Sequence, residues 1–198
     1  MPEPVPSDGA LIEDFVGGRA TAFDALVRRY QAEVYGFLVR MVGDESLADD
    51  LFQDTFLRVM AALPTYRDKG RFRSWLFSVA RNKALDALRR SKLERNIFER
   101  RSHADGDDVA ETEGVTEPAL APDVLAERRE LAERLDRAIA TLPTEQREVV
   151  MLRHSASLTF REIAEVTGDS INTVMGRMRY ANSALSKLLA PIMMEDGQ

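Results

Sequence analysis

Large apolar side chains recur at three- and four-residue steps along much of the chain, and no segment shows the two-residue alternation of a half-buried strand. Thr21 is a candidate N-cap for the first such run, which ends at Gly43, a residue typical of the position after a helix C-terminus. A second run opens at Asp44 and stops at Pro64, and a shorter helix is expected over 11–16. The pattern predicts an all-α protein built as a helix bundle.

The helical pattern breaks over residues 102–122, which are acidic, poor in large apolar side chains and interrupted by prolines. Such a composition is typical of a flexible linker. Helical spacing resumes at Asp123, and the later segment EQREVVMLRH predicts a further short helix. The chain is therefore expected to form two small helical domains, residues 8–101 and 123–192, joined by an acidic flexible linker.

The C-terminal part carries the spacing of a helix-turn-helix. Thr159 and Glu162 fit a capping box, the turn falls at 167–169, and Ser170 can cap the next helix. In a DNA-binding helix-turn-helix this second helix lies in the major groove, although a plain helical hairpin has the same pattern. Gly176 inside it costs roughly 1 kcal/mol relative to alanine, and close approach of the backbone to DNA is one reason for it. The outward positions are Asn172, Thr173, Met175, Gly176, Arg179 and Tyr180.

The apolar spacing of residues 65–101 predicts a long amphipathic helix, and the charge of this segment suggests a binding function for it. This segment holds twelve Lys and Arg against four acids, in a chain whose formal net charge is −6, and residues 102–127 hold eight acids and no Lys or Arg. Aromatic side chains stand beside cations at the entrance of the helix. Cations that follow phosphates, next to rings on which bases stack, suit single-stranded nucleic acid, whereas a charge run in isolation is more simply a solvated face.

Composition narrows the remaining classes of function. Cysteine is absent, which excludes disulfides and thiolate metal sites and fits a reducing cytoplasm. There is no apolar run near the ~18–20 residues that cross a bilayer and no secretory-signal pattern, so no membrane insertion is expected. The histidines, His103 and His154, have no obvious metal or nucleophile partner. We expect no catalytic residue, no metal and no cofactor, and an enzyme is a disfavoured class.

Three stretches, in this order, resemble the extracytoplasmic-function (ECF) group of bacterial RNA polymerase sigma factors. ADDLFQDTFLRV is similar to the second-region motif of that family, FRSWLFSVARNKALDALRR to its promoter-melting helix, and LPTEQREVVMLR with LTFREIAEVTGDSINTVMGRMRYA to its fourth region. The resemblance implies a cytoplasmic factor that binds core RNA polymerase and directs promoter-specific initiation of transcription. Its first domain would capture melted minus-ten DNA, and its helix-turn-helix would read the minus-thirty-five element.

The resemblance also implies partners and site residues. The partners are promoter DNA, an anti-sigma factor, and core polymerase, through the clamp helices of its largest subunit and the flap of its second-largest subunit. The clamp would bind Asp50, Gln53 and Asp54, which are otherwise a solvated polar face. The residues implied for minus-ten DNA are Asp68, Lys69, Arg71, Phe72, Arg73, Arg81, Asn82 and Lys83. Those implied for the minus-thirty-five element are Ser170, Asn172, Thr173, Met175, Gly176, Arg177, Arg179 and Tyr180.

Alternatives stay open at several of these positions. Helical spacing favours Trp75 as a core residue, so Phe72, nearer to the loop, is the better candidate for stacking on a base. Arg177 either contacts DNA or pairs within its domain, which leaves Arg179 as the better candidate for a direct DNA contact. The alternative function is a transcriptional regulator with one C-terminal helix-turn-helix and an N-terminal ligand or dimerisation domain. The basic aromatic helix far from the DNA reader stands against it.

Overall fold

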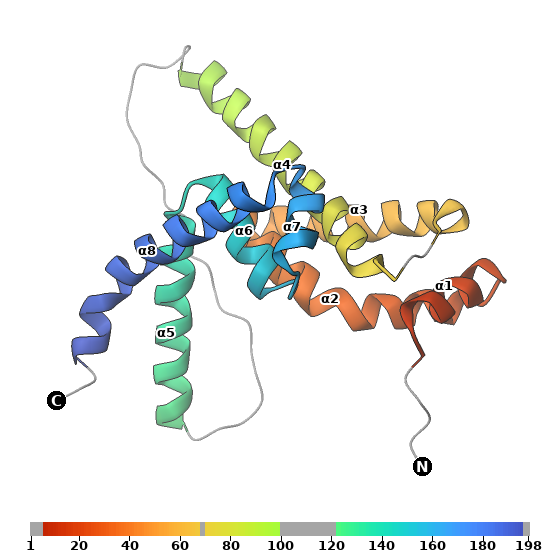
Figure 1. The fold of residues 1–198 in the computed structure, drawn as a ribbon, viewed down its shortest axis with the longest axis horizontal. Coiled ribbons are helices and arrows are strands. Elements are labelled where there is room, and N and C mark those ends of the chain that lie inside the picture. Colours follow the sequence, from red (N-terminus) through yellow and green to blue (C-terminus); the bar gives the residue numbers. More distant parts are fainter. Residues whose placement is uncertain (1–5, 68–69, 100–121, 196–198) are drawn as a thin grey trace.

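The computed structural model describes residues 6–67, 70–99 and 122–195, with the side chains of residues 6–67, 70–94 and 130–189. Every element within these ranges is helical (Figure 1), which confirms the predicted all-α class. Most of the predicted linker lies outside the described residues, and its last residue, Pro122, begins a helix. The helices are α1 (Asp8–Val16), α2 (Ala20–Val42), α3 (Glu45–Ala62), the 3-10 turn η1 (Leu63–Thr65), α4 (Phe72–Glu99), α5 (Pro122–Ala140), α6 (Thr144–His154), α7 (Phe160–Thr167) and α8 (Ile171–Glu195).

Helix α2 is the centre of the N-terminal bundle and packs against α1, α3 and α4. It ends as predicted at Gly43, whose φ of 72° is a left-handed conformation that glycine adopts without strain. Asp44 then caps α3, because its side chain accepts a hydrogen bond from the backbone N–H of Leu47 at 2.9 Å. In the core, Phe37 packs edge-to-face on Phe77 with ring centroids 5.6 Å apart and so joins α2 to α4.

The predicted N-cap of α2 at Thr21 is wrong, because the helix begins at Ala20 and its N-cap is Arg19. The turn out of α1 sets this start. The backbone N–H of Arg19 bonds to the carbonyl oxygen of Asp14 at 2.9 Å, so the chain turns back directly on the end of α1. Apolar periodicity places a helix, whereas its first residue depends on the turn before it.

Helices α7 and α8 form the predicted helix-turn-helix. Thr159 and Glu162 make both bonds of the capping box, and Gly168 ends α7 in the left-handed conformation, with φ 75°. Ser170 caps α8, its hydroxyl oxygen accepting from the backbone N–H of Thr173 at 3.0 Å. Leu185 of α8 is only partly buried. The buried apolar side chains of the two helices are Ile163, Ala164, Val174, Met178 and Ala181.

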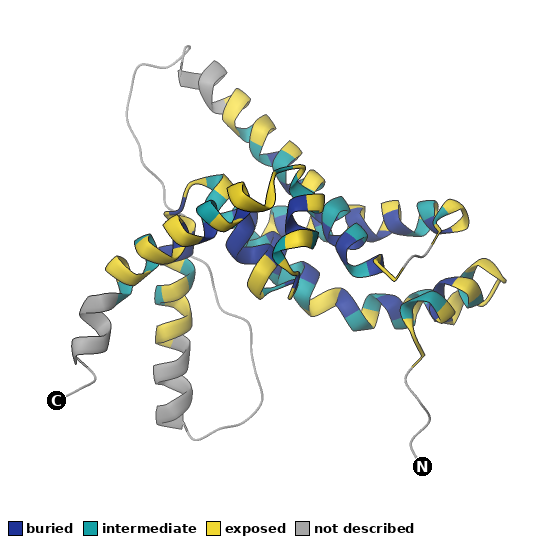
Figure 2. Ribbon diagram, in the orientation of Figure 1, coloured by how far each residue is buried: buried dark blue, intermediate teal, exposed yellow. Residues whose placement is uncertain are grey.

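The two helical units pack against each other. Helix α4 contacts α7, and α2 contacts α5 and α6. One cluster of buried residues runs through both units, and Figure 2 shows the buried segments gathered where the helices meet. The later part of α4 extends away from this body (Figure 1). None of the helices in the described ranges is both long and apolar enough to cross a membrane. The first half of α4, where the minus-ten residues are expected, thus faces helices of the C-terminal unit.

Candidate nucleic-acid and polymerase interfaces

Arg71, just before α4, and Arg73, in its first turn, are both expected at minus-ten DNA, and both bind groups of other segments. Arg71 Nη1 lies 2.6 Å from Glu165 Oε2 of α7. Arg73 Nε donates to the carbonyl oxygen of Ala156, just after α6, at 2.5 Å, and its Nη2 pairs with Glu33 of α2. Both guanidinium groups are therefore bonded to other groups of the same chain.

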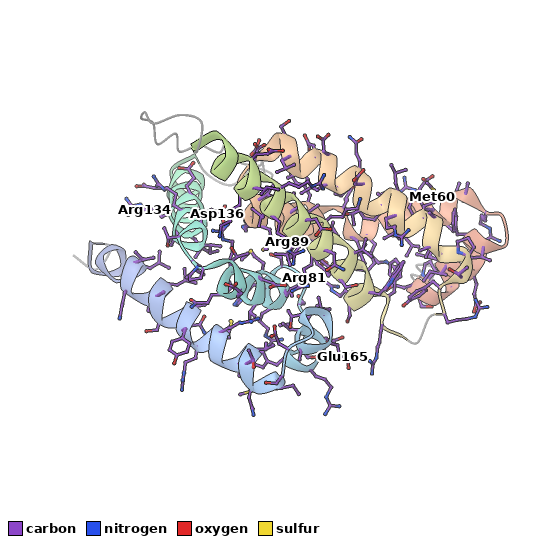
Figure 3. The ribbon with its side chains drawn as sticks, turned by 90° about the horizontal axis from the view of Figure 1, so that it is seen from above. Met60, Arg81, Arg89, Arg134, Asp136 and Glu165 are labelled. Atoms are coloured by element: carbon purple, nitrogen blue, oxygen red, sulfur yellow. The ribbon has the colours of Figure 1, made fainter. Side chains whose placement is uncertain are left out.

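Arg81, further along α4, makes the most buried ion pair of the contact between the units. Figure 3 places it where α4 meets α6, and its Nε pairs with Glu148 Oε1. The Arg81 side chain is 15% exposed and that of Glu148 3%. Burial lowers the pKa of Arg81, yet a guanidinium stays charged at neutral pH. Removing one partner of such a pair leaves an uncompensated buried charge.

Ser74 and Glu162 complete this contact. Ser74 Oγ donates to Glu162 Oε1 at 3.2 Å, while Glu162 Oε2 accepts from the backbone N–H of Thr159 at 2.8 Å and from its hydroxyl at 2.7 Å. Burial raises the pKa of Glu162, but hydrogen bonds from Thr159 and Ser74 and the charge of Arg71 outweigh it, so the pKa lies below its ordinary value. Sequence reasoning missed Ser74, because a small polar residue in a basic helix carries no signal of its own.

The other residues expected at minus-ten DNA are placed differently. Asp68 and Lys69 lie outside the described residues. Asn82 is exposed on α4. Lys83 Nζ lies 2.7 Å from Asp54 Oδ2 of α3, so it joins a residue expected at DNA to one expected at the polymerase.

Phe72 does not offer the expected stacking face in this arrangement, because its side chain is only 2% exposed. Its ring packs against Tyr30 and Tyr66 with centroid distances of 5.7 and 5.9 Å. Trp75 packs on Tyr66 at 4.5 Å, with the ring planes 31° apart, and is partly buried against the core, as its helical spacing favours. The rings that cover Phe72 come from α2 and from the turn before α4, which no local pattern reveals.

The outer face of α8 is open to solvent, with Gly176 half-buried and the exposed residues Ser170, Asn172, Thr173, Met175, Arg179 and Tyr180. The guanidinium of Arg179 lies 5.3 Å from the ring centroid of Tyr180. Arg177 pairs with Asp169 at 2.5 Å, so pairing within the domain holds in this arrangement. A Cβ added to Gly176 would meet no atom within 4 Å. Packing inside the protein therefore gives no reason for a glycine at this position.

A groove between α3 and α4 brings together the three residues expected at the polymerase clamp. Asp50, Gln53 and Asp54 line it from α3 and are all exposed. Sequence reasoning missed its apolar component, Leu57, which lines the same groove and is 58% exposed. Because Leu57 follows Gln53 by four residues on one helix, helical spacing alone would have found it. An exposed leucine beside polar side chains suits a protein partner.

Comparison with known proteins identifies the family. Residues 26–94 match the family model of Sigma-70 region 2, and residues 132–181 match that of Sigma-70, region 4. The RNA polymerase sigma factor CarQ of Myxococcus xanthus is 34% identical over 93% of this chain and 98% of its own length. The RNA polymerase sigma-H factor of Pseudomonas aeruginosa is 30% identical over 95% and 96%, respectively. The ECF RNA polymerase sigma factor SigW of Bacillus subtilis is 29% identical over 87% and 91%.

Solved structures show the same fold. The structure of CnrH in complex with the cytosolic domain of CnrY matches with a TM-score of 0.67 and 27% identity, covering 94% of this chain and 99% of that chain. The sigma factor RpoE of Bartonella quintana, solved with the anti-sigma factor NepR, has a TM-score of 0.67 at 20% identity over 85% of this chain and 96% of that one, which supports the fold alone. The two family models and the relatives named above show that the chain belongs to the ECF group of RNA polymerase sigma factors.

Proposed function

We propose that this sigma factor binds core RNA polymerase through the α3–α4 groove, captures melted minus-ten DNA with the first half of α4, and reads the minus-thirty-five element with the outer face of α8. The main support for the proposal is the solvent-exposed outer face of α8. Asn172, Arg179 and Tyr180 present amide, guanidinium and phenol groups to solvent on the second helix of a capped helix-turn-helix. These are groups that bind base edges and phosphates in the major groove.

In this proposal the two units bind different parts of the promoter. A major-groove reader and a single-strand trap each bind weakly, and mounting both on one polymerase raises the effective concentration of each at the promoter. Arg71, Arg73 and Arg81 supply the cations of the trap. Unstacking a base costs about a few kcal/mol, which binding in a protein pocket offsets. No covalent step by the chain is required.

We also infer an anti-sigma factor as a partner. RpoE of Bartonella quintana was solved with the anti-sigma factor NepR, and CnrH with the cytosolic domain of CnrY. An inhibitor that covered α4 and the outer face of α8 together would block both proposed DNA contacts. Binding to core polymerase would place the chain in the cytoplasm.

Run-off transcription with purified core polymerase on a promoter library tests the proposal, with Leu57→Ser as the informative variant. Loss of an exposed anchor in the groove is expected to weaken binding to core polymerase about tenfold. Val16→Ser is the matched control, since Val16 is another exposed apolar residue, 52% exposed, on α1 away from the groove. Transcripts from selected promoters, reduced in Leu57→Ser alone, support the proposal.

Three results would count against the proposal or a part of it. Wild-type chain that starts no transcript with core polymerase at any promoter contradicts the function as a whole. A band shift of duplex promoter DNA by the chain alone, without polymerase, favours the regulator alternative. Equal polymerase affinity of Leu57→Ser and Val16→Ser would remove the α3–α4 groove from the polymerase interface.

A further inference from the structure

The first residue of α1 is bonded to α2 at the point where α2 meets the start of α4. Asp8 Oδ2 accepts a hydrogen bond from the hydroxyl of Tyr30 at 2.5 Å, and Asp8 Oδ1 pairs with Arg29. Tyr30 in turn contacts Arg73 of α4. We infer that Asp8 and Tyr30 are positioning residues, which hold Arg73 in place for the minus-ten strand. This inference rests on the proposed function, which assigns Arg73 to that strand, and it gives α1 a part in promoter capture.

Helix α2 holds Arg73 with an aromatic ring and a carboxylate. The guanidinium of Arg73 lies 5.6 Å from the centroid of the Tyr30 ring, a distance at which a cation is attracted to the ring face. Its Nη2 pairs with Glu33, which lies one turn after Tyr30 on α2. Tyr30 is 4% exposed, and the ring of Phe72 packs against it at 5.7 Å. This contact of Arg73 with α2 therefore lies wholly within the N-terminal unit.

The hydrogen bond to Asp8 fixes the ring that Arg73 contacts. Tyr30 cannot leave its position without breaking this bond, and a phenol that donates to a carboxylate has a more electron-rich ring, which attracts a guanidinium more strongly. Burial and the bond to Asp8 raise the pKa of Tyr30, so the phenol stays protonated and remains a donor at neutral pH. Arg29 compensates the charge of Asp8. Removing the hydroxyl of Tyr30 would therefore still leave Asp8 with a partner.

Helix α1 reaches Tyr30 because the chain reverses direction after this helix. Gly18 has a φ of 96°, which glycine adopts without strain, and α1 folds back against α2 (Figure 1). Pro6, before α1, adds a second contact, since Arg29 Nη2 donates to its carbonyl oxygen at 2.6 Å. Helix α1 also contacts η1. It is thus placed to support both the turn that precedes α4 and, through Tyr30, the first turn of α4.

Asp8 and Tyr30 would act on DNA only through another residue. Tyr30 is buried, and the negative charge of Asp8 repels phosphates, so neither is suited to bind the strand itself. Loss of the Tyr30 hydroxyl is therefore expected to weaken capture of minus-ten DNA only while Arg73 is present. A residue that is needed merely for folding would show no such dependence on Arg73.

The experiment removes the hydroxyl and keeps the ring, with Tyr30→Phe in the full chain bound to core polymerase. The matched control is Tyr35→Phe, at a second tyrosine of α2 whose hydroxyl lies beside Asp49 of α3. One readout is the affinity for core polymerase. The other is the affinity of the resulting complex for a fork-junction probe, a promoter found by run-off transcription whose minus-ten non-template strand is left single-stranded. Circular dichroism and thermal melting compare the folding of the variants.

We expect Tyr30→Phe to weaken binding of the fork-junction probe about threefold, the size of a weakened cation–π contact, and to leave the affinity for core polymerase unchanged. Tyr35→Phe is expected to match the wild type in both measurements. When Arg73→Ala is already present, adding Tyr30→Phe should have no further effect, because both substitutions then act on the same contact. A loss that persists in the absence of Arg73 overturns the inference, as does an equal loss of affinity for core polymerase.

Asp8→Asn tests the same hydrogen bond from its acceptor, should Tyr30→Phe fail to fold. Its control is Asp14→Asn, which changes a later carboxylate of α1 that pairs with Arg19 at 2.7 Å. The expected result is again a weaker complex with the fork-junction probe, dependent on Arg73.

The variants also separate failure of the inference from failure of the proposed function. If Arg73→Ala weakens the complex with the fork-junction probe but neither Tyr30→Phe nor Asp8→Asn does, the positioning role alone is contradicted. If Arg73→Ala leaves the probe affinity unchanged, the assignment of Arg73 to minus-ten DNA is contradicted, and the inference with it.

Discussion

The carboxylate of Glu162 both caps the N-terminus of its own helix and bonds to a residue of another helix. One oxygen accepts from the backbone N–H of Thr159, which is one of the two bonds of the capping box, and from the hydroxyl of Thr159, while the other oxygen accepts from Ser74 of α4. These bonds stabilise the ionised form, so the pKa of Glu162 falls below its ordinary value despite partial burial. The stability that ionisation contributes is fully present above that ordinary value of 4.5 and is lost as the pH falls through the lowered value of the folded state.

Glu162→Gln is therefore expected to lower the free energy of unfolding by about 0.5–2 kcal/mol at neutral pH, since an amide accepts weaker hydrogen bonds than a carboxylate at a helix N-terminus. The difference from the wild type should shrink as the pH falls below 4.5. Denaturant titrations at several pH values measure it, with Glu133→Gln as an exposed control. A difference that stays constant across the whole pH range would contradict the role of the ionised carboxylate.

Single residues also show where the sequence is informative. The spacing of Thr159 and Glu162 predicts the capping box that is observed, because both bonds are local. Phe72 is different. Its place at the entrance of a basic helix favours an exposed ring, but rings from α2 and from the turn before α4 bury it. The neighbours of a residue along the chain do not indicate which distant segments will pack against its side chain.

At the scale of elements, α8 has a favourable N-cap but contains a glycine, which has low helix propensity, in its interior. Ser170 caps its first turn, and Gly176 then interrupts a helix in which alanine would be favoured. Because a Cβ at this position meets no protein atom within 4 Å, packing cannot explain the glycine. Close approach of the helix backbone to DNA remains the explanation consistent with the proposed function.

Gly176→Ala is expected to raise the free energy of unfolding by about 0.5–1 kcal/mol, through higher helix propensity alone. The same variant should lose transcription several-fold at promoters that depend on the minus-thirty-five element, because the methyl group would hold the helix away from the groove. Ser183→Ala, an exposed position later in α8, is the control that leaves transcription unchanged. A Gly176→Ala variant that is both more stable and fully active would show that the backbone does not approach DNA there.

At the scale of the whole molecule, the sequence predicts the two helical units but not their docking. The apolar period and the caps are local, whereas the pair of Arg71 with Glu165 joins positions 94 residues apart. A second contact between the units also joins residues that are distant in sequence. Arg147 donates to the carbonyl oxygen of Met41, at the end of α2 and 106 residues away, at 3.1 Å. Charge counts could mark α4 as basic, yet they could not show that carboxylates of the same chain would meet it.

These docking contacts include two partly exposed ion pairs, so the shape of the free molecule should depend on salt. Besides Arg71 with Glu165, the pair of Arg40 with Asp136 is 37% and 40% exposed, and both are weakened when the Debye length falls from about 10 Å at 0.1 M salt to a few ångströms near 1 M. We expect the radius of gyration from small-angle X-ray scattering to rise with sodium chloride concentration. The double variant Arg40→Gln with Glu165→Gln, which lacks both pairs, should change little over the same range. A wild-type radius that stays constant would mean that buried contacts, not ion pairs, hold the units together.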